Sequence, residues 1–156
     1  MGAHGEPHPP LGPAELESLR AALRDGTLGP VTGRFEELVG YRVRHDAEHG
    51  VYLELDIAEP HLNQYGVAHG GVTLTLLDTV GGVACFYHTP GLRRMATISL
   101  AASFVRGVER GRVVATAGLD QIGGSVAHVT MRLRARSFDG PLLATATGAY
   151  RLFRAR

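Results

Sequence analysis

The longest hydrophobic run in the chain lies in its middle, over residues 72–87. Asp78 is the only charged residue between His69 and His88. The run is too long for a typical strand, so its length predicts a helix, and its nearly uniform apolar character predicts burial on all sides. It is shorter than the roughly 20 apolar residues that cross a bilayer, and it carries a carboxylate, so we do not expect a membrane span.

Apolar and polar residues alternate along much of the remaining chain, which is typical of half-buried strands. Before the long helix, the alternation predicts strands over residues 41–45 and 51–57. After it, short turns separate four more predicted strands, over residues 96–106, 112–121, 125–137 and 142–153. This order predicts an α+β fold, with a mostly antiparallel sheet packed on one long helix. One sheet leaves much of the helix uncovered, which favours a dimer.

The first part of the chain carries weaker signals. Residues 13–25 predict a short helix with Leu16, Leu19 and Leu23 on one apolar stripe, and residues 35–38 predict one helical turn. Gly, Pro and His dominate residues 1–12, and Gly and Pro recur over residues 27–33, which predicts a disordered tail and a linker. We therefore divide the chain into an N-terminal tail with a short helix, residues 1–33, and one domain, residues 34–156.

Composition narrows the possible partners. The 156 residues suit one domain with a real core, and the net charge of +1 gives no electrostatic case for nucleic acid or an anionic membrane. Cys85 is the single cysteine, so no intrachain disulfide can form, and we expect a cytoplasmic protein. The sequence has no zinc-ligand spacing or phosphate-binding loop, so we expect no metal and no cofactor.

Candidate chemistry gathers around the start of the long helix. Gly70 and Gly71 lie where free backbone N–H groups and the positive end of the helix dipole could hold a developing oxyanion. Asp78 could act as a general base or nucleophile, or it could simply fix packing through Thr75 or Thr79. Asp78 is eight residues beyond Gly70, or roughly 12 Å along the axis. If both groups act on one carbonyl, they must come from two chains, which again favours a dimer.

The pattern Asn63-x-x-Gly66-x-x-His69-Gly70-Gly71, followed seven residues later by Asp78, resembles the hotdog-fold acyl-CoA thioesterases. The similarity extends over about residues 35–153 and is greatest to the phenylacetate-pathway type, with the 4-hydroxybenzoyl-CoA and 1,4-dihydroxy-2-naphthoyl-CoA thioesterases related to it. It implies a hydrolase that releases a free acid and coenzyme A from an acyl- or aryl-CoA thioester. It also implies a homodimer at least, with dimers pairing into a homotetramer.

The resemblance also implies a role for each residue of the motif. Asp78 would be the nucleophile or the base that activates water, and the Gly70 N–H would polarise the thioester carbonyl. Asn63 would orient the water or the substrate, and His69 would support the loop and the sulfur end of the thioester. In the family, the aspartate faces the asparagine and glycine of the partner protomer.

Substrate-binding residues are expected around these groups. Gly71 would offer backbone to the substrate. Gly81 and Gly82 would leave space for the acyl or aryl group, or they could equally allow close packing of the helix on the sheet. Arg106 matches a basic position that the resemblance places near the nucleotide of coenzyme A. Related thioesterases often carry a basic residue after the glycine of the 123–125 turn, whereas this chain has Gly124 and Ser125. Their backbone N–H groups and the serine hydroxyl could replace that contact. Otherwise the nucleotide would be held more weakly, or the carrier would be protein-bound phosphopantetheine.

Two other functions fit parts of the pattern. Some hotdog dehydratases also carry a carboxylate in the central helix and a histidine in a loop, but the Pro-Gly-His-Phe-Pro loop of the carrier-protein dehydratases is absent. A non-catalytic acyl-CoA-binding module is the third possibility. Sensors of this fold usually carry an added DNA-binding segment, and the first thirty residues show no basic patch.

Overall fold

A computed structural model describes residues 12–25 and 34–154. Residues 1–11 of the expected tail and the expected linker over 27–33 lie outside the described residues. The helical elements are α1 (Pro13–Arg24), α2 (Arg34–Val39), the 3-10 turn η1 (Glu59–His61) and α3 (Gly70–His88). The strands are β1 (Arg42–Asp46), β2 (Gly50–Ile57), β3 (Leu92–Phe104), β4 (Gly111–Gly123), β5 (Val126–Ala135) and β6 (Leu142–Arg154).

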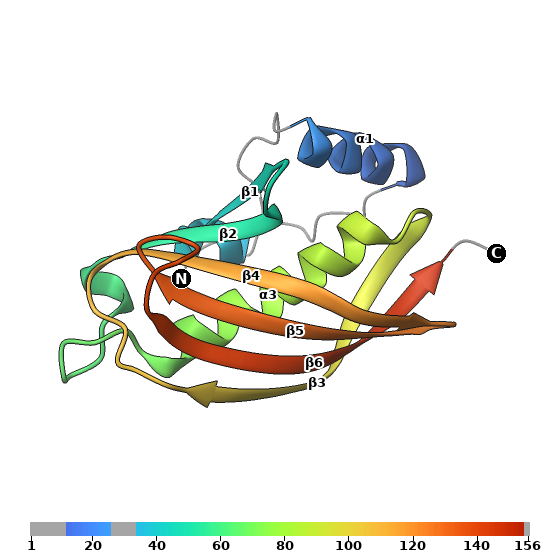
Figure 1. The fold of residues 1–156 in the computed structure, drawn as a ribbon. Helices are drawn as coiled ribbons and strands as arrows, with labels where there is room; N and C mark the ends of the chain where they lie inside the picture. The colour runs from blue at the N-terminus through green and yellow to red at the C-terminus, as the bar shows by residue number, and fades with distance from the viewer. Residues whose placement is uncertain (1–11, 26–33, 155–156) are drawn as a thin grey trace, which may run out of the picture.

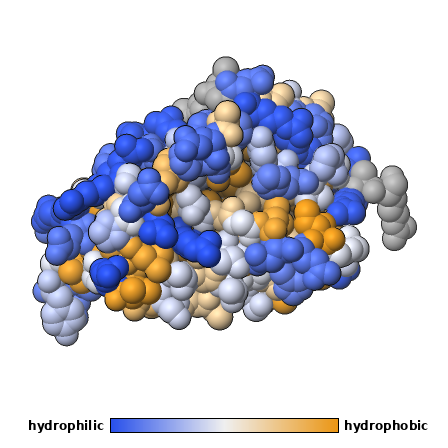
Figure 2. All heavy atoms as spheres, viewed as in Figure 1, coloured by the Kyte–Doolittle hydropathy of each residue, from blue (hydrophilic) through white to orange (hydrophobic). Residues whose placement is uncertain are grey.

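The strands form one antiparallel sheet in the order β1-β2-β4-β5-β6-β3, and the sheet curves around α3 (Figure 1). The predicted α+β arrangement is thus confirmed. On β5, Val129 and Met131 are buried against α3, whereas His128 and Arg132 are exposed on the other face. Figure 2 shows hydrophilic residues over much of the surface in view, with hydrophobic patches toward the lower left and the right.

Helix α3 supplies the centre of the core. Leu76, Leu77 and Val80 are 1%, 0% and 0% exposed, and burial of each such side chain contributes about 1.5–3 kcal/mol. By length and composition alone the helix could span a membrane, but it packs against β2 to β6 as a core helix does. The prediction of burial on all sides is wrong for the single chain. Leu74 is 38% exposed and Asp78 is only partly buried, because none of the described elements covers this side of α3.

Strand β3 differs most from its predicted bounds, beginning four residues earlier and ending two residues earlier. It is an edge strand of 13 residues, so the charged Arg93 and Arg94 can sit on it with solvent beside them. At its other end, the N–H groups of Val105 and Arg106 both donate to the carbonyl of Leu143 and leave the ladder. The result is a long, uncovered edge that also carries Ile98, which is 56% exposed.

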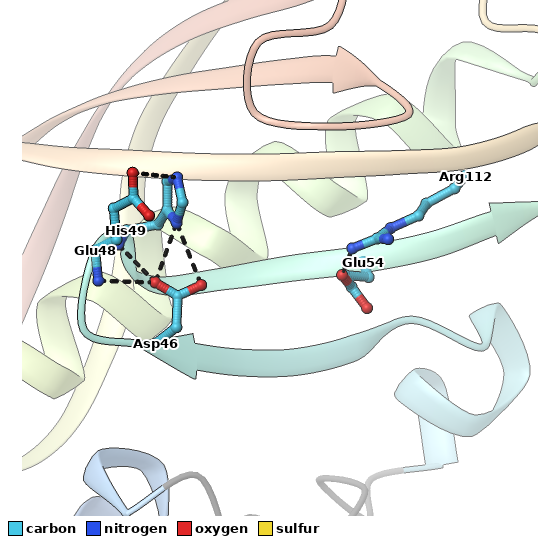
Figure 3. Close-up of polar contacts among 5 residues, drawn as sticks. All are labelled: Asp46, Glu48, His49, Glu54 and Arg112. Atoms are coloured by element: carbon cyan, nitrogen blue, oxygen red, sulfur yellow. Dashed lines mark hydrogen bonds and ion pairs between the residues drawn. The ribbon is translucent and has the colours of Figure 1, made fainter.

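The β1–β2 turn is held by Asp46, whose carboxylate accepts hydrogen bonds from the N–H groups of Glu48 and His49 at 3.0 and 2.7 Å (Figure 3). The bond from the His49 N–H lowers the pKa of this carboxyl. Further along β2, Glu54 accepts a hydrogen bond from the guanidinium of Arg112, which lies on the neighbouring strand β4 (Figure 3). These contacts fix a surface hairpin and its register, and none of them involves Asp78.

Helix α1 is attached to the C-terminal end of α3 through a buried arginine. Arg20 is 1% exposed, and its guanidinium donates hydrogen bonds to the carbonyl oxygens of Phe86 and Thr89, each at 3.2 Å, and of Leu92 at 3.4 Å. It also lies 4.4 Å from the centroid of the Phe86 ring. The carbonyls at the end of a helix have no partners within the helix and carry negative partial charge, so a cation stabilises them.

Replacing Arg20 with Met is expected to lower the free energy of unfolding by about 3 kcal/mol, because buried carbonyls lose charged donors while the aliphatic stem is retained. Urea denaturation measures the change. Arg24→Met is the matched control, since Arg24 is exposed in the last turn of the same helix and should change stability by less than about 0.5 kcal/mol. Equal effects of the two changes would show that Arg20 does not anchor α1.

Candidate active site

Asp78 lies in the third turn of α3 with its carboxylate held by two hydroxyl groups. The Thr97 hydroxyl of β3 donates to Asp78 Oδ1 at 2.9 Å. The Tyr150 hydroxyl of β6 lies 3.2 Å from the same oxygen and 3.0 Å from the Asp78 carbonyl oxygen. Among the described residues, no side chain donates to Oδ2. One carboxylate oxygen is therefore fixed by the sheet, and the other is available for chemistry.

Tyr150 was not predicted as a site residue, and it is buried at 1% exposure. Burial, with the neighbouring Asp78 charge as a second cause, raises the pKa of its phenol, so the hydroxyl stays protonated and donates. The ring fits only because residue 81 is glycine. A Cβ at Gly81 would lie 2.7 Å from the Met131 sulfur and closer still to the Tyr150 hydroxyl. Gly81 therefore permits the helix–sheet approach that brings Tyr150 to Asp78.

The loop before α3 is ordered by its own side chains. The Asn63 Oδ1 accepts from the Tyr65 N–H at 2.9 Å, and the Asn63 N–H donates to the Val67 carbonyl at 2.8 Å. His69 is the N-cap of α3, where its Nδ1 accepts from the Gly71 N–H at 2.9 Å. The Gly70 N–H has no acceptor among the described residues. Of the two glycine amides expected to serve a ligand, only that of Gly70 is therefore free.

Arg106 lies at the same end of the molecule as Gly70. The Phe104 ring lies 3.6 Å from the place of a Gly70 Cβ, which is an ordinary contact, so packing within the chain does not require glycine there. The Ala68 N–H donates to the Val108 carbonyl at 2.8 Å, which joins the β3–β4 loop to the loop before α3. The Arg106 guanidinium donates to the Leu142 carbonyl at 2.8 Å and is exposed.

The remaining predicted residues lie further along α3 and the sheet. The space beside Gly82 is occupied by Met95, whose sulfur is 3.4 Å from the place of a Gly82 Cβ. Gly124, with φ of 43°, and Ser125 form the β4–β5 turn, where the Ser125 carbonyl accepts from the Leu152 N–H at 2.8 Å. Figure 1 shows this turn and the start of α3 at opposite ends of the sheet. Within one chain, the predicted site residues therefore form two groups that lie apart. The first group is Asn63, His69, Gly70, Gly71 and Arg106, and the second is Asp78, Gly82, Gly124 and Ser125.

Other reactive side chains offer less. Burial raises the pKa of the Cys85 thiol to about 11, so it is an inert core residue. His61 is bound on both ring nitrogens, accepting from the Ala58 N–H at 3.0 Å and lying 2.8 Å from the Val39 carbonyl. Within the described residues, no group of three or more His, Cys, Asp or Glu side chains is placed to hold a metal ion.

The sequence matches known proteins most clearly over its central part. A family profile described as the thioesterase superfamily matches residues 65–137. The candidate esterase PA0474 of Pseudomonas aeruginosa is 32% identical over 111 residues, which are 70% of this chain and 80% of that protein. The candidate esterase TV1331 of Thermoplasma volcanium is 30% identical over 90 residues, 56% of this chain. The chain spans only 64% of the length of that second relative.

Solved structures share the fold. A candidate thioesterase from Ralstonia eutropha JMP134, described as related to phenylacetic acid degradation, is 25% identical with a TM-score of 0.70, covering 86% of this chain and 99% of its own. BH2602 from Bacillus halodurans, solved with CoA, is 22% identical with a TM-score of 0.70, and the match covers 92% of this chain and 94% of that protein. These likenesses confirm the hotdog fold, and with the Pseudomonas relative and the profile match they show that the chain belongs to the thioesterase superfamily.

Proposed function

We propose that the protein hydrolyses an acyl- or aryl-CoA thioester to a free acid and coenzyme A, and that it is of the phenylacetate-pathway type. The observation that carries the proposal is the Asp78 carboxylate, fixed through Oδ1 by Thr97 and Tyr150 with Oδ2 unengaged. A carboxylate held in one orientation can attack a carbonyl carbon or take a proton from water. Family membership supports a thioester as the substrate, and the geometry of Asp78 supports its proposed role as the group that acts on the thioester.

The active site is proposed to be shared by two protomers. Within one chain, the free Gly70 N–H and the Asp78 carboxylate belong to the two separated groups of residues described above. Edge strand β3 carries Thr97 and the exposed Ile98, and its open ladder can pair with the β3 of a second copy. Such an isologous contact also covers the open side of α3, so that each Asp78 meets the Gly70 of the other protomer. We propose a homodimer of this kind, with dimers pairing into a homotetramer.

In this arrangement the thioester carbonyl oxygen accepts a hydrogen bond from the Gly70 N–H at the N-terminus of α3. Negative charge that develops on this oxygen is stabilised by the amide and the helix dipole. His69 holds the helix start through the Gly71 N–H, and Asn63 orients water or substrate from the same loop. The C–S bond breaks, the coenzyme A thiolate takes a proton, and water supplies the oxygen of the acid. The chemistry needs no metal and no cofactor beyond the substrate's own coenzyme A.

Two routes use the same carboxylate. In direct attack, Asp78 forms an anhydride with the acyl group, and water then opens it. In the general-base route, Asp78 takes a proton from the water that attacks the carbonyl. In single turnover in ¹⁸O-labelled water, label in the Asp78 carboxylate identifies direct attack with opening at the Asp78 carbonyl. General-base attack, and opening of the anhydride at the acyl carbonyl, both place the label in the acid only.

Coenzyme A is proposed to contact both groups of residues. Arg106 is exposed beside the Gly70 end of one protomer, and the Gly124–Ser125 turn offers backbone N–H groups from the other. Arginine is well suited to phosphate oxygens, and glycine N–H groups can approach them closely. The structure of BH2602 with CoA supports this choice of carrier.

Thiol release from a panel of acyl- and aryl-CoA thioesters tests the function. We expect turnover, with phenylacetyl or similar aryl thioesters among the best substrates; no hydrolysis across the panel would overturn the proposal.

Mixing subunits tests whether the active site is shared by two protomers. Asp78→Ala and Asn63→Ala homodimers should each be inactive, and co-refolded mixtures should regain about a quarter of wild-type activity, because half the dimers are mixed and each contains one intact site. No recovery in verified mixed dimers would place the whole site within one chain.

A further inference from the structure

An apolar cavity of about 320 Å³ lies between α1 and the body of the domain. Leu16, Leu19 and Leu23 of α1 form one wall, and Val83 and Phe86 of α3 and Met95 of β3 form others. Arg20 fixes α1 above this space through its bonds to the end of α3. Nothing in the proposed chemistry described so far uses the cavity.

Two of the residues that line the cavity are near Asp78 in the sequence or near its hydrogen-bond partner Thr97. Thr79, the residue after Asp78, lines it. So does Met95, two residues before the Thr97 whose hydroxyl binds Asp78. A substrate with its carbonyl at Asp78 can therefore direct its acyl group past Thr79 and Met95 into the space beneath α1.

The size and lining suit a small apolar group. Ligand pockets commonly measure roughly 300–1,000 Å³, and a cavity of roughly 150 Å³ lined by Leu, Ile and Phe can hold benzene. Three charged residues line the cavity: Arg93 and Arg94 are exposed, and Glu36 is partly buried. Inside, burial is the main cause that raises the pKa of Tyr41 to about 12, so its phenol is neutral and interacts with Thr79 and Glu36. Among the described residues that line the cavity, neither arginine is buried, so a charged acyl terminus would find no buried cation in that lining.

We propose that this cavity holds the acyl group of the substrate, and that the leucines of α1 set the largest group that is accepted. The inference rests on the proposed thioesterase function and names its substrate class. The preferred acyl group is uncharged and apolar, either one aromatic ring with a short linker or a chain of about six to eight carbons. Leu19, partly exposed on the cavity wall, is a specificity-determining residue.

Varying the size of residue 19 tests the proposal against straight-chain acyl-CoA thioesters from acetyl to dodecanoyl, together with phenylacetyl-CoA. Leu19→Phe should lower kcat/KM for octanoyl- and phenylacetyl-CoA by about tenfold and change acetyl-CoA by less than about threefold. Leu19→Ala should move the optimum toward longer chains. Ser18→Ala, on the exposed side of α1, is the control and should change no ratio between substrates. Equal effects of the Leu19 variants on every chain length would overturn the proposal.

A binding measurement keeps this inference separate from the proposed function. S-hexyl-CoA, a thioether that cannot be hydrolysed, should shift the NMR signal of a ¹³C-labelled Met95 methyl group, and Leu19→Phe should abolish that shift. This result would support the cavity even if the wild type hydrolysed no thioester. S-hexyl-CoA that fails to bind, or that binds without moving the Met95 signal, would overturn the assignment even if hydrolysis were observed.

Discussion

Asp78→Asn is expected to lower kcat for thioester hydrolysis by about 10³-fold or more, with no change in fold. The amide keeps the shape of the carboxylate, and its oxygen can still accept from Thr97 and Tyr150. What is lost is the negative charge that attacks carbon or accepts a proton. Thiol release under saturating substrate measures kcat, and circular dichroism with thermal unfolding confirms that the variant is folded.

Asp120→Asn is the matched control for this change. Asp120 also accepts a hydrogen bond from a threonine on a neighbouring strand, with Thr130 Oγ1 at 2.7 Å, but it is exposed on the sheet surface. This control should leave kcat within about twofold of wild type, as surface substitutions usually do. Full activity in Asp78→Asn, confirmed also in Asp78→Ala, would remove Asp78 from the mechanism.

Much of the fold could be predicted because local pattern and global packing agree. The length of the apolar run over residues 72–87 predicted the long helix. Helix α3 begins two residues before this run and ends one residue after it. Strict alternation in the later strands gave β5 and β6 to within two residues. The error at the start of β3 has a physical cause. Arg93 and Arg94 are charged residues at the start of this strand, and an edge strand tolerates them because solvent lies beside it.

The contacts that hold the site could not be predicted in the same way, because they join distant segments. Tyr150 and Asp78 are 72 residues apart, and no local pattern relates them. A signal was nevertheless present: Tyr150 falls on the buried face of β6, and a buried phenol usually has a hydrogen-bond partner. Arg20 gave a similar signal, since it lies on the same helical stripe as Leu16 and Leu23, where a cation must find buried acceptors.

Gly81→Ala is expected to have the largest effect of any single methyl group added to α3. The new Cβ would overlap the Tyr150 hydroxyl and the Met131 sulfur, and those two side chains are 1% and 0% exposed. Neither can move without disturbing the core. Overpacking of this kind costs about 1–3 kcal/mol, and displacement of Tyr150 also removes one of the two hydroxyl donors to the Asp78 carboxylate. We therefore expect lower stability and at least about tenfold lower kcat, measured by urea unfolding and thiol release.

The next residue along the helix provides the control. At Gly82 the added Cβ would meet only the flexible Met95 side chain, at 3.4 Å, and alanine favours the helix by about 1 kcal/mol over glycine. Gly82→Ala should therefore leave stability unchanged or raise it. Tyr150→Phe removes the overlapping hydroxyl, so the double variant Gly81→Ala/Tyr150→Phe should be more stable than the sum of the single effects allows. If Gly81→Ala and Gly82→Ala were equally stable and active, contact between Tyr150 and Asp78 would not depend on glycine at position 81.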